Sequence, residues 1–262
     1  MGEGYARMSS DTLYRSGVRG TAVGVTLSLL LSSCGGSSET DNGRCAVTAA
    51  SMLNWGSPNR EDTFAGADSL QDWTVYDGPG HAGNGRRTPS AMSVDAGMLT
   101  ITGDAQGNSG GMGWLPGQLH GRWEACVKSS PAPEAYHSLV LLWPDAEDWP
   151  NGGEIDFMEV VEPSRTSVEF WLHWGAGGQK AQSEVRVDAA EWHSYAVEWT
   201  AAHLIYYVDG EPEWLISDPA HLPPRPMHLC VQLDYFGGDA GHGARQWVDW
   251  VRQYDTAEEG ET

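Results

Sequence analysis

The stretch of residues 151–159 limits what this chain can fold into more than any other, because it holds three carboxylates among apolar residues. Ile155 and Phe157, with Val160 and Val161 just beyond, are β-branched or aromatic, which is typical of a buried strand. Side chains alternate along a strand, so Glu154 and Asp156 share one face, whereas Glu159 would point to the opposite face. A β-bulge at residues 157–158 would add one residue and bring all three acids to one face.

Three carboxylates on one face of a strand weaken a sheet, because like charges repel and apolar neighbours oppose ionisation. Glycoside hydrolysis needs this combination, since it uses one ionised carboxylate and one protonated carboxyl group. With the bulge, Glu154 and Glu159 lie about four strand steps, or roughly 13 Å, apart along the backbone. Inward-leaning side chains on a curved sheet can close most of this gap. Asp156 lies between them and can share a proton with Glu154. The alternative is a solvated acidic loop, which the apolar context and Gly152-Gly153 disfavour.

The acidic segment resembles the signature of glycoside hydrolase family 16, the laminarinase-like and lichenase-like β-glycanases, in its bulged form E-x-D-x-x-E. The similarity covers most of the chain after about residue 60 and includes further blocks in the family's order. The resemblance implies an all-β jelly-roll sandwich of two antiparallel sheets with a curved active-site cleft. It also implies hydrolysis of internal β-linkages of a polysaccharide with retention of configuration. The additional blocks are Trp143-Pro, Trp149-Pro-Asn-Gly-Gly, residues 192–199, Tyr207-Val-Asp209-Gly210 and residues 248–252.

The same resemblance assigns roles to the acids. Glu154 is expected to be the nucleophile, Glu159 the general acid/base, and Asp156 the residue that assists Glu154. His173 would tune Glu159 by a hydrogen bond or hold the sugar. Aromatic rings pack well on the apolar face of a pyranose, so tryptophans are expected beside the sugar. The expected substrate-binding residues are Trp143, Trp149, His173 and Gln232.

No cofactor is expected to be needed for catalysis. Many relatives bind a structural calcium through an aspartate in the closing strand, and Asp249 is the matching residue. Calcium takes six to eight oxygen ligands, so one carboxylate alone would need backbone carbonyls near the first strand.

The formal net charge of −21 and the presence of only two lysines argue against nucleic acid and anionic membrane surfaces as partners. A neutral polysaccharide remains compatible, whereas a sulfated polymer would need a local basic site. The pair Arg86-Arg87 is the nearest candidate, and its Gly- and Pro-rich surroundings favour a solvated turn. The protein is expected to be a monomer.

Residues 1–33 have the features of an export signal, with Arg15 and Arg19 before an apolar run that is too short to span a membrane. Leu31-Ser-Ser-Cys34 resembles a bacterial lipobox, in which Cys34 becomes lipidated. We therefore expect an exported protein, lipid-anchored at the cell surface or outer membrane. A plain secretory signal is the alternative, and Met8 is a candidate start.

The rest of the chain divides into three parts. Residues 34–58 lack a hydrophobic period and are expected to form a flexible linker, residues 59–255 the jelly-roll catalytic domain, and residues 256–262 a disordered acidic tail. In an oxidising compartment Cys45, Cys126 and Cys230 cannot all pair within one chain. Cys126 and Cys230 could form a disulfide or remain buried thiols, and the sequence does not decide between these.

A β-1,3- or mixed β-1,3/1,4-glucan is the first substrate expected. Galactan hydrolysis of the agarase or carrageenase type and transglycosylation are alternatives. A surface protein that binds carbohydrate without catalysis is an alternative of another class, although such proteins usually lose one of the acids.

Overall fold

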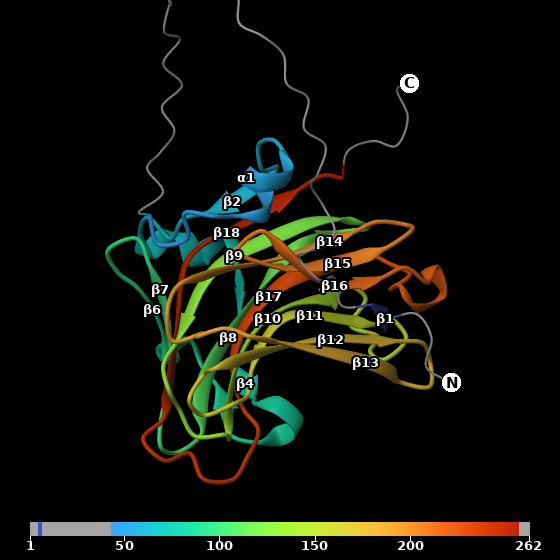
Figure 1. Cartoon of the computed structure of the whole chain (residues 1–262). Helices are drawn as coiled ribbons and strands as arrows, with labels where there is room; N and C mark the ends of the chain where they lie inside the picture. The colour runs from blue at the N-terminus through green and yellow to red at the C-terminus, as the bar shows by residue number, and fades with distance from the viewer. Residues whose placement is uncertain (1–4, 7–42, 257–262) are drawn as a thin grey trace, which may run out of the picture.

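Two sheets packed face to face make up most of the structure, a computed structural model that describes residues 5–6 and 43–256 (Figure 1). Among these residues, each sheet has nine strands, and all strand pairs are antiparallel except β5 with β8. The predicted jelly-roll sandwich is confirmed. Most of the predicted export signal, and Cys34 with it, lie outside the described residues.

The first sheet contains the first and the last described strands, together with the framework strands that follow the catalytic segment. In spatial order its strands are β1 (Tyr5–Ala6), β16 (Glu211–Ile216), β15 (Leu204–Val208), β14 (His193–Trp199), β9 (Gly121–Ser129), β18 (Ala244–Tyr254), β7 (Leu99–Gly103) and β6 (Met92–Val94), and β2 (Arg60–Asp62) pairs with β18.

The second sheet carries the acidic strand near its centre. In spatial order its strands are β13 (Gln179–Arg186), β12 (Ser167–Trp174), β11 (Glu154–Val160), β10 (Tyr136–Pro144), β17 (Met227–Tyr235), β8 (Asn108–Gln118), β5 (Arg86–Arg87) and β4 (Gly78–Pro79), and β3 (Thr74–Val75) pairs with β8.

Helical segments are short and lie in the connections. They are α1 (Ala49–Leu53) and the 3₁₀ turns η1 (Ala67–Asp72), η2 (His81–Gly83), η3 (Pro89–Ala91) and η4 (Pro219–His221). Within the described part of the chain, no helix has the length and apolar character that crossing a membrane requires.

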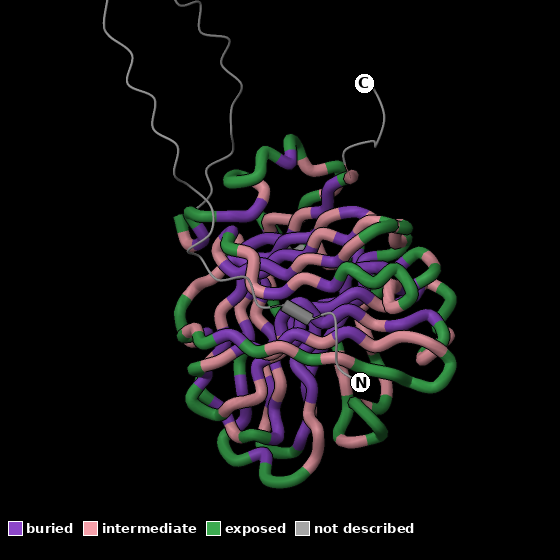
Figure 2. The backbone as a smooth tube through the Cα atoms, turned by 45° about the vertical axis from the view of Figure 1, so that its right-hand side comes forward, coloured by how far each residue is buried: buried purple, intermediate pink, exposed green. Residues whose placement is uncertain are grey.

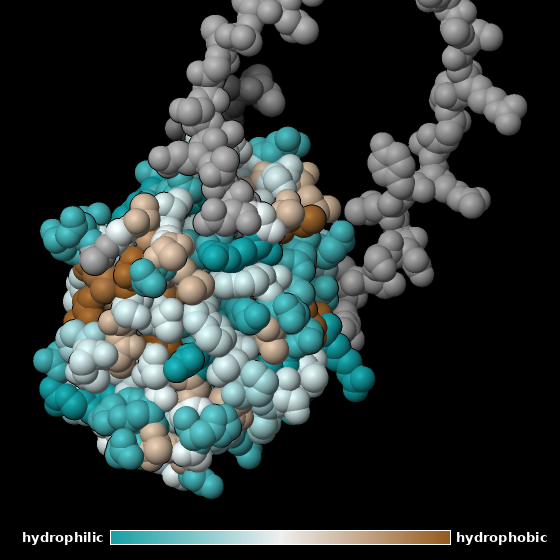
Figure 3. Space-filling view, turned by 90° about the vertical axis from the view of Figure 1, so that its left-hand side faces the viewer, coloured by the Kyte–Doolittle hydropathy of each residue, from teal (hydrophilic) through white to brown (hydrophobic). Residues whose placement is uncertain are grey.

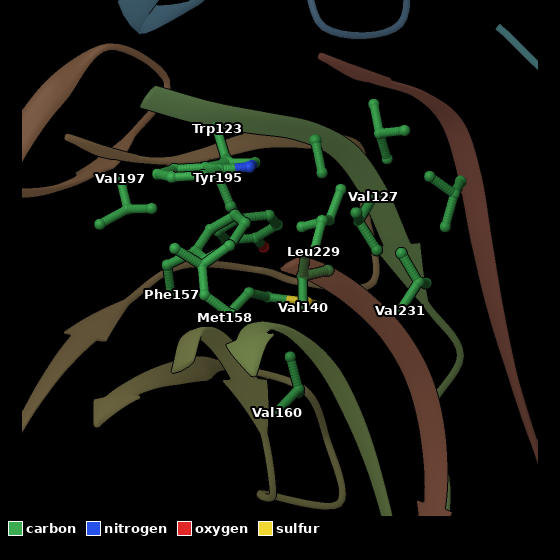
Figure 4. Packing of buried hydrophobic residues seen from close by; sticks show 14 of the residues in the cluster. Trp123, Val127, Val140, Phe157, Met158, Val160, Tyr195, Val197, Leu229 and Val231 are labelled. Carbon is green, nitrogen blue, oxygen red and sulfur yellow. The ribbon is translucent and has the colours of Figure 1, made fainter. Parts of the chain in front are cut away.

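The core lies between the two sheets, where alternate side chains of each strand point inward. Buried backbone follows the strands of both sheets, while exposed residues gather in the loops (Figure 2). Trp123 and Tyr195 of the first sheet meet Phe157 and Val140 of the second, as Figure 4 shows. The face seen in Figure 3 is largely hydrophilic or neutral, with apolar side chains in limited patches.

Residues 43–58 are not a free linker, because they pack on the outer side of the first sheet. Cys45 forms a disulfide with Cys126, and the Trp55 ring lies edge-on to Tyr207 and Tyr254 at centroid distances of 5.8 and 5.5 Å. The predicted linker is therefore wrong from residue 43 onward. Its contacts come from isolated residues that meet distant strands, so they leave no hydrophobic period in the sequence.

The disulfide also settles the question of the cysteines. Cys230 remains a buried free thiol while Cys126 is paired, so neither alternative considered for Cys126 and Cys230 is found. Cys126 faces outward on the first sheet, whereas Cys230 lies on the second, in a separate cluster with Leu139 and Leu141. Of the predicted acidic tail, only Thr256 is among the described residues.

Candidate active site

The strand β11 carries the three acids, and its pairing with β12 reveals the extra residue. Glu154, Asp156 and Glu159 stand opposite His173, Trp171 and Glu169. The partners on β12 are two residues apart each time, while the acids are two and then three apart. The predicted bulge is confirmed, and it brings Glu159 into phase with the other acids.

The core side of β11 gives the reason for the bulge. Phe157 and Met158 are consecutive residues, yet both are fully buried in the core between the sheets (Figure 4). Ile155 and Val160 are buried in the same core. Two adjacent apolar side chains can both point inward only if the strand alternation is interrupted between them, so burial of this pair turns Glu159 outward.

The outer face of the second sheet, turned away from the core, is here called the acid face. The strand registers arrange it as three rows that cross β12, β11, β10 and β17, with one acid in each row. The row of Glu159 holds Glu169, Leu139 and Gln232; the row of Asp156 holds Trp171, Leu141 and Cys230; Glu154 stands beside His173.

The loop before β11 depends on two glycines. A Cβ atom on Gly152 would lie 2.5 Å from Cβ of Pro144 and 2.6 Å from Oδ1 of Asp148. Gly153 has φ +80, a left-handed conformation that side chains rarely adopt. The chain can therefore pass close to the preceding loop and enter β11 directly at Glu154.

Glu154 and Asp156 form a coupled pair of carboxyl groups. Burial raises the pKa of Glu154 to about 7, and hydrogen bonds from Trp149 and Asp156 oppose this increase. Burial, followed by the charges of Glu154 and Glu159, raises the pKa of Asp156 well above its usual range. Asp156 therefore holds the shared proton near neutral pH and leaves Glu154 as the group that ionises first.

His173 lies in a different place from the one predicted. It stands opposite Glu154 in the register, and its Nε2 is 3.8 Å from Oδ2 of Asp156. Its ring lies near those of Trp149 and Trp171, at centroid distances of 6.4 and 5.9 Å. The predicted hydrogen bond from His173 to Glu159 is therefore not formed, because a β-strand register places them in different rows. The role in sugar binding stays a prediction.

A histidine that the sequence did not single out contacts Glu159 instead. Nδ1 of His137, on β10, lies 2.7 Å from Oε1 of Glu159. His137 precedes an uninterrupted apolar run, so its sequence gives no sign of which side chains face outward. Only the register of β10 with β11, in which Leu139 faces Glu159, places His137 on the acid face.

The two predicted tryptophans differ in exposure. Trp149 is 48% exposed and hydrogen-bonds Glu154, so its ring lies beside the acids with a surface open to a ligand. Trp143 packs on the cluster of Leu139, Leu141 and Cys230, and its Nε1 donates to Oε2 of Glu147 at 2.9 Å. Trp149 is the better placed of the two for contact with a sugar.

Gln232 lies in the row of Glu159 but is buried, and its Oε1 accepts a hydrogen bond from Nη2 of Arg87 at 2.7 Å. Arg87 also donates to both oxygens of Asp234, at 2.8 and 2.6 Å. The interpretation of Arg86-Arg87 as a solvated turn is therefore wrong for Arg87. Arg86 faces solvent and pairs with Asp77.

Among the described residues, one group has the donor atoms to hold a metal ion, namely Glu154, Asp156 and His173, whose atoms lie within 4.8 Å of one another. The predicted calcium ligand Asp249 is not in this group. Its Oδ1 accepts a hydrogen bond from the Arg44 guanidinium, whereas its Oδ2 is buried without a hydrogen-bond partner among the described residues. Calcium binding through Asp249, which would need further oxygen ligands, stays a prediction.

A pocket of about 600 Å³ opens beside the acid face at the end nearest Glu159. His137 and Phe236 line it, together with residues 133–135 and 237–239. A second pocket of about 350 Å³ lies near Arg86, Asp104 and Asn108, away from the acids.

Comparison with known proteins points in the same direction as the geometry. Residues 84–252 match the family described as Glycosyl hydrolases family 16. Endo-1,3-1,4-beta-glycanase EglC of Rhizobium meliloti is 28% identical over 224 residues, which are 76% of this chain and 46% of that protein. A beta-glucanase of Rhodothermus marinus is 30% identical over 165 residues, which are 52% of this chain and 57% of that protein.

The chain thus spans about half the length of these curated relatives. The laminarinase structure from Rhodothermus marinus superposes with a TM-score of 0.68 and 23% identity, and covers 77% of this chain and 98% of that one. At this identity the likeness shows a shared fold.

Proposed function

The chain belongs to glycosyl hydrolases family 16, and from this premise we propose that it is a retaining endo-β-glycanase. The observation that carries the proposal is the phase of the three acids. A bulge in β11 aligns Glu154, Asp156 and Glu159 on one face, although this places like charges together in a poorly hydrated site. Such an arrangement is costly for folding and useful for double displacement.

In the first step, a carboxylate oxygen of Glu154 attacks the anomeric carbon of the sugar. The glycosidic bond breaks, and Glu159 gives its proton to the leaving oxygen. In the second step, Glu159 takes a proton from water, water attacks the anomeric carbon, and the bond to Glu154 breaks. Two inversions give net retention. These side chains carry the chemistry without a cofactor.

Asp156 assists by donating a hydrogen bond to Glu154. Because burial and two neighbouring acids raise the pKa of Asp156, it stays protonated while Glu154 is ionised. A neutral donor orients the attacking oxygen without adding negative charge. Trp149, half-exposed and bonded to Glu154, is proposed to stack on the sugar at the reacting centre.

The proposed substrate is a neutral β-1,3- or mixed β-1,3/1,4-glucan. The names of the glycanase and glucanase relatives support this class, and so does the net charge of −21, which disfavours a polyanion. On the acid face, Arg87 is occupied by Asp234 and Gln232, so it is not free to bind a sulfate group. Galactans and transfer to an acceptor sugar are outcomes that the same experiment would reveal.

We further propose that the protein is exported and lipid-anchored through Cys34, and that it works as a monomer. The disulfide Cys45–Cys126 supports an oxidising compartment. Labelling with a radioactive fatty acid in a bacterial host should mark the wild type and leave Cys34→Ser unlabelled. Equal labelling of both proteins would contradict the anchor.

The proposed function is tested by release of reducing ends from laminarin, lichenan, agarose, carrageenan and galactan. The soluble domain from residue 43 is compared with Glu154→Gln in the same assay. Activity on a glucan that disappears in the variant is the expected result. Binding of a polymer without turnover would favour the non-catalytic alternative, and activity that persists in Glu154→Gln would exclude the nucleophile.

A further inference from the structure

We infer that His137 is a positioning residue that holds Glu159 in the orientation needed for proton transfer to the leaving group. The inference rests on the proposed function, because it deepens the role of Glu159 as general acid/base. It concerns a residue on β10 that lies in neither the acidic motif nor the predicted set of sugar contacts.

The contact between the two side chains is short and sheltered. Nδ1 of His137 lies 2.7 Å from Oε1 of Glu159, and each side chain is only 12% exposed. Hydrogen bonds that involve an ionised partner are stronger than neutral ones, and low exposure limits competition from water. The contact uses one carboxyl oxygen, which leaves the second oxygen to face the glycosidic bond.

The ring of His137 is itself held in place. It stacks on Phe236 with a centroid distance of 3.7 Å and an interplanar angle of 15°. His81 also stacks on Phe236, at 4.0 Å and 17°. Two rings cannot share one face at these distances, so Phe236 lies between the two histidines. This three-ring stack restricts rotation of the His137 side chain and so fixes Nδ1.

The neighbours of the pair leave His137 free for Glu159. Asp234 stands opposite His137 on β17, but Arg87 binds both of its carboxylate oxygens. On the other side, Glu169 stands beside Glu159 on β12. When both carboxyl groups are ionised, their like charges push Glu159 toward β10, which is also the direction of its hydrogen bond with His137.

An imidazole nitrogen suits a group that changes protonation during the reaction. Glu159 begins with a proton, loses it to the leaving oxygen, and regains one from water. Nδ1 can accept a hydrogen bond from the protonated carboxyl group or donate one to the carboxylate, according to the protonation of the ring. The same contact can therefore hold Glu159 in both steps, which a side chain that only donates or only accepts would not do.

The test uses two substrates that differ in their need for a proton. Hydrolysis of a phenyl β-glycoside of laminaribiose requires acid assistance, whereas 2,4-dinitrophenol leaves readily as the anion. General acid catalysis contributes about 10²–10⁴-fold to rate. We expect His137→Ala to lower kcat/KM about 30- to 100-fold on the phenyl glycoside and less than about threefold on the dinitrophenyl glycoside. kcat/KM is used because it reports the first step, in which Glu159 acts as acid.

Two further variants separate positioning from packing. His137→Asn keeps an amide nitrogen near the place of Nδ1 and should restore part of the loss on the phenyl glycoside. His81→Ala removes the outer ring of the stack but leaves Phe236 against His137 and Nδ1 of His137 beside Glu159, so its loss on the phenyl glycoside should be much smaller than that of His137→Ala. Activity of His137→Ala on the dinitrophenyl glycoside also shows that the variant is folded.

Each result decides the question. A loss in His137→Ala that is equal on both glycosides, or no loss on either, would overturn the positioning role while the proposed function stands. A wild-type protein inactive on both glycosides and on every polymer would overturn the proposed function, and the inference with it.

Discussion

Carboxylates of the two sheets lie in opposite environments, although the residue types are the same. On the first sheet, Glu198 is half-buried and accepts hydrogen bonds from Arg122 and His203, which lower its pKa against the effect of burial. On the second sheet, burial raises the pKa of Glu154 to about 7, and the side chains whose charges act on this pKa are acids as well. The first arrangement stabilises the fold, whereas the second is maintained at the expense of stability.

The comparison extends beyond this pair. On the first sheet, Asp249 binds Arg44, and Glu61 binds Arg252. Glu124 is the exception, since burial raises its pKa to about 7. One of its oxygens is nevertheless paired, because the backbone N–H of Ala49 donates to its Oε1 at 2.7 Å. A raised pKa alone therefore does not mark a catalytic group. Crowding of acids on one open face does so more directly.

The largest expected effect comes from the second sheet. Glu154→Gln should reduce polysaccharide hydrolysis by about 10⁴-fold or more, since loss of a nucleophile in a concerted set of residues has effects of this size. Glu198→Gln is the matched control on the first sheet and should retain wild-type kcat/KM. Activity is measured by reducing-end release. Similar losses of activity in both variants would contradict the view that the acids of the second sheet serve catalysis and those of the first sheet serve the fold.

The next effect belongs to the first sheet alone. The disulfide Cys45–Cys126 closes a loop with a sequence separation of 81 residues. Replacing both cysteines with serine should lower the free energy of unfolding by about 2–5 kcal/mol. Urea unfolding of the folded domain measures this change, and activity below the transition should persist. Loss of activity in the native variant would show that the two sheets are not independent in function.

A smaller loss of stability is expected for Glu198→Gln, because it leaves Arg122 and His203 without their carboxylate partner. Breaking a partly exposed pair of this kind should cost about 1–2 kcal/mol of unfolding free energy. Urea unfolding at pH 7 gives the value. A variant as stable as the wild type would mean that the ion pairs of the first sheet do not stabilise it.

The contributions of Glu154 and Glu198 to stability should change with pH in opposite directions. The pKa of Glu154 is higher in the folded state than in the unfolded state, so the folded protein binds more protons between about pH 4.5 and 7. Its contribution to the unfolding free energy therefore falls as pH rises through this window. The lowered pKa of Glu198 acts oppositely and adds stability that is lost as pH falls.

Unfolding measured from pH 4.5 to 8 should show a weaker decline in Glu154→Gln than in the wild type, by on the order of 1 kcal/mol. An unchanged pH profile in this variant would contradict the buried environment of Glu154. The acidic limb of kcat/KM in the wild type should follow the same ionisation, because only ionised Glu154 attacks.

Much of the second sheet could be predicted from the sequence because its signal is local. The spacing of Glu154, Asp156 and Glu159, with apolar residues between them, was enough to predict the strand, the bulge and the shared face. The resemblance of later blocks then predicted the sandwich. Hydrophobic periodicity and short motifs are both patterns over a few neighbouring residues, and such local patterns can be recognised in a single sequence.

Contacts between distant strands could not be predicted in this way. His137 meets Glu159, and Arg87 meets Asp234, because of the order and register of strands that are far apart in sequence. The same reason explains the disulfide of Cys45 with Cys126 and the burial of Trp55. His173 was assigned to the wrong acid because its row depends on the register of β12 with β11.

The most direct test of the account is the unfolding free energy of Asp156→Asn at pH 7, measured together with its activity. Asparagine resembles the protonated aspartic acid in shape but carries no charge and no titratable proton. If the acids of β11 are held for catalysis at the expense of folding, the variant should be as stable as the wild type or more stable, while polysaccharide hydrolysis falls at least about tenfold. A variant that loses more than about 1 kcal/mol of stability and keeps full activity would show instead that Asp156 serves the fold.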